Sequence, residues 1–341
     1  MILLTYGTRP EYIKIKPLID IFKKNNFPFK VLFTGQQVNL ADFYFDYVLH
    51  IKEGGNRLDT VVKSIMDNLQ PIIRDSNPTY VLVQGDTTSA FAMALSAFHH
   101  KLKVIHLEAG LRTYDNDNPY PEEVNRKLIS QLADIHLCPT EHALSNLCRE
   151  NIEGMKVLCG NTVIDNLVSY KEKCEYTDKI LVTLHRRENH EIMDKWFTQI
   201  EMLAKKYVGT YEFILPLHPN PNVQKHKDLL KHVFVVDPLP YEDLLELLVK
   251  TRLVISDSGG IQEECSFFNK KCLTCRVVTE RPEAMNQSTF LVKSPDDLFE
   301  MFEEHHNDYK IDYVCPFGDG KSSEKIYKFL TGWESKLGFL D

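Results

Sequence analysis

Carboxylates suited to acid–base chemistry gather between positions 104 and 126, in the sequence VIHLEAGLRTYDNDNPYPEEVNR. The apolar run 104–107 predicts a buried strand that delivers Glu108 to a loop, and the loop then presents Glu122 and Glu123. A buried strand followed by loop carboxylates is how an α/β enzyme collects acid–base groups at one edge of its sheet. The same residues also fit a strand end followed by a helix start, because the helix dipole favours Glu in a first turn.

Asp86 has a similar setting. The apolar run 80–83 predicts a strand, and Gly85 and Asp86 follow it, at the position where open α/β sheets place their ligands. Asp86 also fits as the N-cap of a helix predicted from Ala90. Because a residue of the TTS sequence at 87–89 can cap that helix equally well, Asp86 is available for chemistry.

The N-terminus reads as a strand at 2–5, a GTRPE turn at 7–11 and a helix over 12–24. Arg9 lies in the turn and Lys14 one turn into the helix, where the helix N-terminus can hold phosphate. A solvated turn is the alternative. The pattern is not GxGxxG, so the sequence contains no dinucleotide fingerprint here.

Two stretches of the second half suit a phosphorylated ligand. In HRREN at 185–189, His185 follows a predicted strand and can donate to a phosphate or stabilise a leaving group, although a surface basic patch also fits. In SDSGGIQEE at 256–264, the glycines let the backbone approach a ligand and the helix start exposes N–H groups that can bind a diphosphate. Glu264, one turn in, can reach a ribose, and Arg276 and the loop 279–283 add charge nearby.

The alternation of apolar runs and helical periods predicts an α/β protein with two Rossmann-like, doubly wound domains and a cleft between them. The pattern changes around 155–166, and a charged, linker-like segment follows over 170–179. We therefore expect one domain over 1–166 and a second over 167–321. The tail from 322 to 340 predicts a helix with one apolar face, which is formed by Ile326, Phe329, Leu330, Trp333 and Leu337.

Composition narrows the function further. A net charge of −8 over 341 residues argues against nucleic acid as the main partner, although a few local Arg and Lys residues can still hold a small anion. No apolar run approaches the roughly 20 residues of a membrane helix, and the N-terminus lacks a signal-peptide pattern, so we expect a cytoplasmic protein. Cys272 and Cys275 have metal-like spacing but lie in an apolar run, which favours core packing.

In combination these motifs resemble the non-hydrolysing UDP-N-acetylglucosamine 2-epimerases, and they stand in that family's order over nearly the whole chain. They are GTRPE at 7–11, GDTTS at 85–89, HLEAGLRT at 106–113, PEEVNR at 121–126, HRREN at 185–189, SDSGGIQEE at 256–264 and TERPE at 279–283. The resemblance implies a GT-B-type fold whose two domains close on UDP. It also implies a homodimer and a C-terminal helix, at about 322–341, that packs back onto the first domain.

The resemblance further implies anti elimination of UDP to give 2-acetamidoglucal, followed by re-addition after C2 is reprotonated on its other face. Neither a nicotinamide cofactor nor a metal is required. By motif position the catalytic residues are Asp86, Glu108, Glu122 and His185. The residues expected to bind substrate or UDP are Arg9, Lys14, Arg126, His218, Ser258, Gly259, Gly260, Glu264 and Arg276. Gln36, Arg57 and Arg186 match positions where bacterial members bind an activating second substrate molecule.

Three alternatives stay open at this stage. The same reaction can act on a UDP-2-acetamido-2,6-dideoxyhexose, of the D or L series, because no motif reports on the C6 hydroxyl. A hydrolysing epimerase shares the scaffold. A GT-B glycosyltransferase or a UDP-sugar binder without activity has less need of the carboxylates and His185 together.

Overall fold

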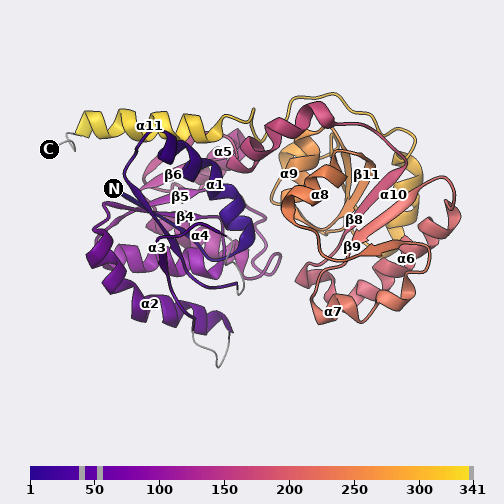
Figure 1. Cartoon of the computed structure of the whole chain (residues 1–341), viewed down its shortest axis with the longest axis horizontal. Coiled ribbons are helices and arrows are strands. Elements are labelled where there is room, and N and C mark those ends of the chain that lie inside the picture. Colours follow the sequence, from indigo (N-terminus) through magenta and orange to yellow (C-terminus); the bar gives the residue numbers. More distant parts are fainter. Residues whose placement is uncertain (38–42, 52–56, 338–341) are drawn as a thin grey trace. The chain divides into compact units, whose positions relative to one another are not determined.

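The computed structural model describes residues 1–37, 43–51 and 57–337, and the side chains of residues 333–337 lie outside the described part. The chain forms two compact units (Figure 1). Unit 1 comprises Met1–Asn166 and Gly318–Asp341, and unit 2 comprises Leu167–Phe317.

Unit 1 is built on a seven-stranded parallel sheet in the order β3-β2-β1-β4-β5-β6-β7. Its strands are β1 (Ile2–Tyr6), β2 (Phe29–Phe33), β3 (Tyr47–Val48), β4 (Tyr80–Gln84), β5 (Lys103–Leu107), β6 (Ile135–Cys138) and β7 (Met155–Leu158). Its helices are α1 (Arg9–Lys24), α2 (Arg57–Ser76), α3 (Thr88–His99), α4 (Glu122–Leu132), α5 (Glu141–Arg149) and α11 (Ser322–Leu337).

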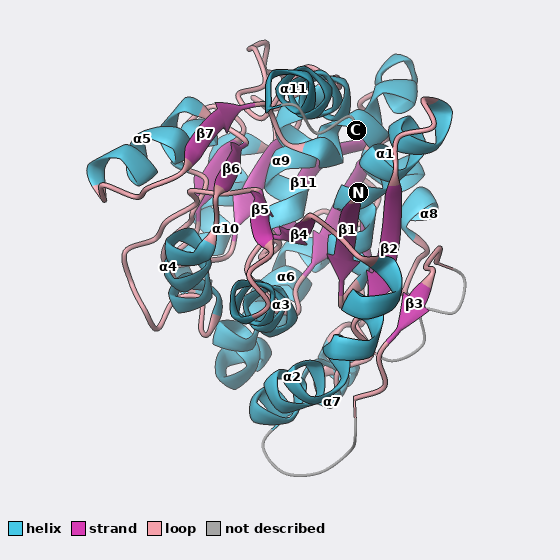
Figure 2. Cartoon of the chain, turned by 90° about the vertical axis from the view of Figure 1, so that its left-hand side faces the viewer, coloured by secondary structure: helices cyan, strands magenta, loops and turns pink. Residues whose placement is uncertain are grey.

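Apolar side chains cover both faces of this sheet, as a parallel sheet requires. Along β1, Ile2 and Leu4 pack on the face covered by α1 and α11, whereas Leu3 packs on the face covered by α2 and α3. Helix α11 runs along unit 1 (Figures 1 and 2), and its Ile326 and Leu330 are buried in the first of these cores. The predicted apolar face is confirmed there, while the side chains of Trp333 and Leu337 lie outside the described part.

Unit 2 is built on a six-stranded parallel sheet in the order β10-β9-β8-β11-β12-β13. Its strands are β8 (Lys179–Thr183), β9 (Glu212–Pro216), β10 (Phe234–Val236), β11 (Thr251–Ser256), β12 (Lys271–Thr274) and β13 (Thr289–Leu291). Its α-helices are α6 (Met193–Lys206), α7 (Pro221–Gln224), α8 (Tyr241–Leu248), α9 (Gly259–Phe267) and α10 (Leu298–His305). Cys272 and Cys275 are fully buried in it, so the prediction of core packing is confirmed.

Both sheets follow one winding rule. In each sheet the second and third strands are added on one side of the first strand, and the chain then crosses to its other side. As a result β1 lies beside β4 in unit 1, and β8 lies beside β11 in unit 2. Such a switch point opens a crevice at the carboxyl ends of the two strands, which is where α/β sheets bind ligands. The GTRPE and GDTTS sequences follow β1 and β4, and HRREN and SDSGG follow β8 and β11.

Some local predictions were wrong. Helix α1 begins at Arg9 rather than Tyr12, because Thr8 is its N-cap and the fixed φ of Pro10 suits the first turn of a helix. The two-residue strand β3 was missed because it is too short to show a periodicity. The linker expected over 170–179 is partly helical, since a 3-10 segment spans Thr162–Lys173. Residues 52–56 lie outside the described part, and Arg57 begins α2.

Candidate active site

Glu108 is the most enclosed of the predicted catalytic carboxylates. It follows β5 with a φ of 69° and is 7% exposed. Lys14 donates to its Oε1 at 2.5 Å, Asn161 donates to the same atom at 2.9 Å, and Gln84 donates to Oε2 at 2.5 Å. A left-handed backbone at a non-glycine residue costs about 1–3 kcal/mol and clusters at functional sites. These donors hold Glu108 in that conformation as a paired carboxylate.

Asp86 lies one strand away, after β4. The neighbouring Thr87 is the N-cap of α3, and its hydroxyl accepts from the N–H of Ala90 at 3.1 Å. As predicted, Asp86 is therefore not the capping residue. Arg126 donates to Asp86 Oδ2 from Nε at 2.8 Å and lies 2.7 Å from it through Nη2. Arg126 is 3% exposed. Arg126, which was predicted to bind substrate or UDP, is therefore paired with a carboxylate of its own unit.

The two acids of the PEEVNR sequence have different surroundings. Glu123 is fully buried and accepts from the backbone N–H groups of Thr113 and Tyr114, both at 3.0 Å, and from Arg126 at 2.8 Å. It fixes the loop before α4. Glu122 begins α4 and is partly exposed. Its helix is docked beside Asp86, because Arg126 stands one turn further along.

The donors of the GTRPE turn are largely occupied within unit 1. Glu11 is 2% exposed and accepts from Gly7 N at 3.0 Å, Thr8 Oγ1 at 2.8 Å and Thr87 Oγ1 at 2.8 Å. Burial raises the pKa of Glu11 to about 7, although these donors oppose the shift. Lys14 is paired with Glu108. Binding of an anion at this turn, as predicted, would therefore depend on the Arg9 side chain, which is partly exposed.

Two of the predicted regulatory residues lie together beside the start of α3. Arg57 Nη2 donates to the carbonyl of Gln36 at 2.9 Å, and Gln36 Oε1 accepts from Ser89 N at 2.9 Å. Arg186 belongs to unit 2. A regulatory role for the three residues stays a prediction.

In unit 2 the loop after β8 is tied to Asp257, directly after β11. Asp257 is fully buried and accepts from the backbone N–H groups of His185, at 3.0 and 3.1 Å, and of Arg186, at 2.9 Å. Asn189 donates to it at 3.0 Å. The predicted catalytic His185 therefore stands at the switch point of unit 2.

The His185 side chain is 36% exposed, and its ring stacks on the ring of His218 with centroids 5.1 Å apart. His218 follows β9, so the structure brings two predicted ligand-binding residues side by side. Burial lowers the pKa of His185, which Arg186 reinforces and Asp257 opposes. Burial and the neighbouring His185 lower the pKa of His218. Both rings are therefore biased toward the neutral form before an anion binds.

Helix α9 presents its N-terminus at the same edge. Ser258 is the N-cap and makes no side-chain capping bond, so the first N–H groups of α9 are not capped by that hydroxyl. A Cβ on Gly259 would lie 2.5 Å from Arg281 Nη1, whereas a Cβ on Gly260 would come no closer than 3.9 Å to Ser258 Oγ. Glu264 is 3% exposed and accepts from Tyr241 Oη at 2.8 Å.

Arg276 lies within a buried charge network behind α9 and is 2% exposed. It contacts Glu280 Oε2 at 3.0 Å and Glu188 at 3.6 Å. Arg281 bonds Glu280 and donates to Glu263 at 2.6 Å. The TERPE loop is thus tied to α9 through Arg281 and Glu263, and Glu280 is tied to the HRREN loop through Arg276 and Glu188. Arg276, which was predicted to bind substrate or UDP, is therefore held by ion pairs within the protein.

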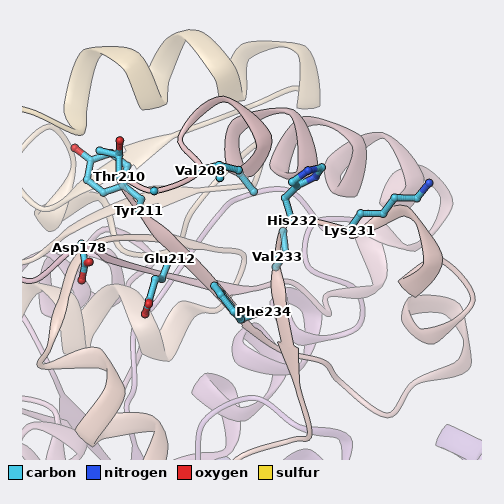
Figure 3. Close-up of a pocket in the computed structure, with 11 residues that line it drawn as sticks. Asp178, Val208, Thr210, Tyr211, Glu212, Lys231, His232, Val233 and Phe234 are labelled. Carbon is cyan, nitrogen blue, oxygen red and sulfur yellow. The ribbon is translucent and has the colours of Figure 1, made fainter.

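The pocket in Figure 3 lies at the other end of the unit 2 sheet. Its volume is about 490 Å³, and Asp178, Glu212 and Phe234 in its lining stand at the amino ends of β8, β9 and β10. His185 and His218 follow the carboxyl ends of β8 and β9. This pocket is therefore separate from the candidate active site.

Sequence reasoning missed several residues that hold the site, namely Gln84, Asn161, Tyr241, Asp257 and Glu11. Glu11 lies in the GTRPE sequence and Asp257 in the SDSGGIQEE sequence, but no role was predicted for either acid. Gln84 directly precedes GDTTS, and Asn161 follows β7 in a Gly-Asn-Thr sequence, so strand-end position was the available signal.

No helix in the described ranges is both long and apolar enough to cross a membrane. Comparisons with known proteins identify the family of this chain. A family profile described as UDP-N-acetylglucosamine 2-epimerase matches residues 20–331. The UDP-N-acetylglucosamine 2-epimerase of Neisseria meningitidis is 38% identical, with 96% of this chain and 98% of that protein aligned. The enzyme of Campylobacter jejuni is 37% identical, over 96% of this chain and 97% of that protein.

Solved structures give the same result. The crystal structure of the Neisseria meningitidis enzyme bound to UDP-GlcNAc has a TM-score of 0.86 and 36% identity, and covers 97% of this chain and 99% of that one. The Methanocaldococcus jannaschii enzyme in complex with UDP-GlcNAc and UDP has a TM-score of 0.82 and 29% identity, over 97% and 99% of the two chains. The wall teichoic acid polymerase TagF, at 12% identity and a TM-score of 0.56, shares the fold.

These matches confirm the expected α/β, GT-B-type fold and show an isomerase acting on a carbohydrate derivative. On its motifs, its two switch-point sites and its full-length relatives, the chain belongs to the UDP-N-acetylglucosamine 2-epimerase family.

Proposed function

We propose that the enzyme reversibly converts UDP-GlcNAc into UDP-ManNAc by epimerisation at C2. The observation that carries the proposal is the pair of strand-end carboxylates in unit 1. Asp86 and Glu108 follow the neighbouring strands β4 and β5, and each is held by a cation from a helix. The binding of UDP-GlcNAc by the Neisseria meningitidis relative supports the choice of substrate.

In the proposed reaction one carboxylate takes the proton from C2 while the C1–O bond to UDP breaks on the opposite face. The products are 2-acetamidoglucal and UDP. A carboxylic acid then returns a proton to the other face of C2, and UDP adds back at C1. Asp86, Glu108 and Glu122 are the proposed acid–base groups. The sequence of steps is redox-neutral, and we propose that it needs neither a cofactor nor a metal.

Unit 2 is proposed to hold the nucleotide. The N-terminus of α9, with Ser258, Gly259 and Gly260, supports this proposal, because the N–H groups and the dipole at the start of a helix favour an anion. His185 and His218 stand beside it after the adjacent strands. Glu264 is proposed to accept from the ribose, and His185 to stabilise the departing diphosphate.

We also propose that the enzyme works as a homodimer in the cytoplasm. The full-length family resemblance supports the dimer, which light scattering of the purified protein tests. All eight cysteines are free thiols, as expected in a reducing compartment.

Proton NMR of the purified enzyme with UDP-GlcNAc in D2O tests the reaction. We expect UDP-ManNAc to appear and deuterium to enter C2 of both epimers. Protein that is folded and binds UDP but gives neither exchange nor epimer would overturn the assigned substrate, and a UDP-2-acetamido-2,6-dideoxyhexose would be tried next. Release of free ManNAc would instead identify a hydrolysing enzyme.

A further inference from the structure

Asp257 joins the two loops that form the unit 2 site. In the parallel pair β8 and β11, Thr183 stands opposite Ser256, and the N–H of Asp257 donates to the carbonyl of Thr183 at 3.2 Å. Asp257 is the next residue after β11, and His185 is the second residue after β8. The register of the sheet therefore fixes the carboxylate beside the start of the histidine loop.

The contacts of Asp257 are directed at that loop. Its two oxygens accept from the backbone N–H groups of His185 and Arg186 and from the amide of Asn189. Asn189 is itself held, because it donates to the Cys275 carbonyl at 3.0 Å and accepts from Trp196 Nε1 at 3.1 Å. All these donors are neutral, so the negative charge of Asp257 is not cancelled by them.

The His185 ring lies next to this charge, with Nδ1 3.7 Å from Asp257 Oδ1. An ionised carboxylate only accepts hydrogen bonds, so it favours a proton on the imidazole nitrogen that faces it. Nε2 of the same ring is then left to exchange a proton with a ligand. Other charged and titratable groups near the ring, among the described residues, include Arg186, Glu188, His190 and His218.

We propose that Asp257 is a positioning residue that keeps Nδ1 of His185 protonated, so that Nε2 is the nitrogen that meets the ligand. When an anion binds, Nε2 takes up a proton and donates to it, and Asp257 stabilises the imidazolium that results. Because Asp257 also precedes Ser258, the N-cap of α9, it sets the histidine and the helix N-terminus relative to each other. That the anion is the diphosphate of UDP rests on the proposed function, whereas the position of the proton does not.

Nitrogen NMR of protein labelled with 15N-histidine tests the proton position directly. The His185 signals are identified by their loss in His185→Gln, and they are recorded at a pH where the ring is neutral. We expect the proton on Nδ1 in the wild-type enzyme. A proton on Nε2 would overturn the proposal, and this measurement depends neither on activity nor on any Asp257 variant.

A double-mutant cycle tests whether Asp257 acts through His185. Alone, Asp257→Asn should lower kcat by at least about tenfold, more than it changes KM, and shift the pH profile of kcat. In the His185→Gln background the same change should cost less than about twofold. Equal losses in both backgrounds would mean a general structural role and overturn the proposal. If wild-type enzyme does not turn over UDP-GlcNAc, the proposed function fails, and the NMR result still decides the proton position.

Discussion

Glu108 in unit 1 and Asp257 in unit 2 are both buried carboxylates placed directly after a central strand, yet they are stabilised differently. Glu108 pairs with the ammonium of Lys14 and accepts from the amides of Gln84 and Asn161. Asp257 is held chiefly by backbone N–H groups and one amide. A side-chain cation can shift as charge changes during a reaction, whereas backbone donors are fixed by the sheet. The difference fits proton transfer in unit 1 and fixed support of an anion site in unit 2.

Removing the cation should produce the largest effect on stability. Lys14→Met leaves Glu108 without its ammonium partner, and breaking a buried pair in this way costs about 3–5 kcal/mol. Urea unfolding measures the loss. Lys16→Met on the same helix is the matched control, because Lys16 and Asp20 form an exposed pair at 2.7 Å whose loss should cost less than about 0.5 kcal/mol. Equal losses in the two variants would show that Glu108 does not need the charge.

Glu11 in unit 1 is, like Asp257, a buried carboxylate whose hydrogen-bond donors are neutral. The pH dependence of stability tests how such a carboxylate behaves. Its pKa is raised from 4.5 to about 7, so the folded state takes up a proton before the unfolded chain does. As the pH falls from about 7 to 4.5, the wild type should therefore gain stability over Glu11→Gln, by up to about 3 kcal/mol.

The measurement for Glu11 is the free energy of unfolding of both proteins over this pH range. The buried His106 and His136 have lowered pKa values and destabilise the fold as the pH falls, but both proteins retain them, so the difference between the curves cancels their effect. A difference that does not change with pH would contradict the prediction.

Glu108→Gln separates chemistry from binding. The variant keeps the shape of the side chain but removes its acid–base capacity, so turnover should fall at least about 10²-fold while the affinity for UDP stays nearly unchanged. Asp86→Asn and Glu122→Gln should behave alike. Steady-state kinetics and calorimetry with UDP measure the two quantities. Unchanged turnover in any of the three variants would remove that residue from the chemistry.

The smallest expected effect concerns the paired glycines of α9. Gly259→Ala forces a methyl group to within 2.5 Å of the Arg281 guanidinium, so we expect a loss of about 1–3 kcal/mol in stability. Gly260→Ala has room and should be neutral or stabilising by less than about 1 kcal/mol. Thermal unfolding compares the two. Similar losses in the two variants would contradict the prediction that the ion pairs of Arg281 require a glycine at position 259 in particular.

Much of the site could be located from the sequence. Apolar runs placed Glu108, Asp86 and His185 directly after strands, and the TTS sequence indicated a cap that spares Asp86, which the structure confirms at Thr87. These are local inferences, because the strand, the turn and the cap lie within a few residues of one another. The roles of Arg126 and Arg276 could not be read in this way, since an Arg in a polar motif fits a ligand and a buried partner equally well.

The sequence by itself therefore determined the α/β class, the family and the strand-end positions of the candidate residues. Only the tertiary structure decided which of them meet. Lys14 reaches Glu108 across 94 positions and Arg126 reaches Asp86 across 40, and Asp257 meets a loop some 70 residues earlier. The physical reason is that such contacts depend on which strands are neighbours. The crossover that sets β1 beside β4 and β8 beside β11 depends on the packing of whole helices and strands rather than on any one motif.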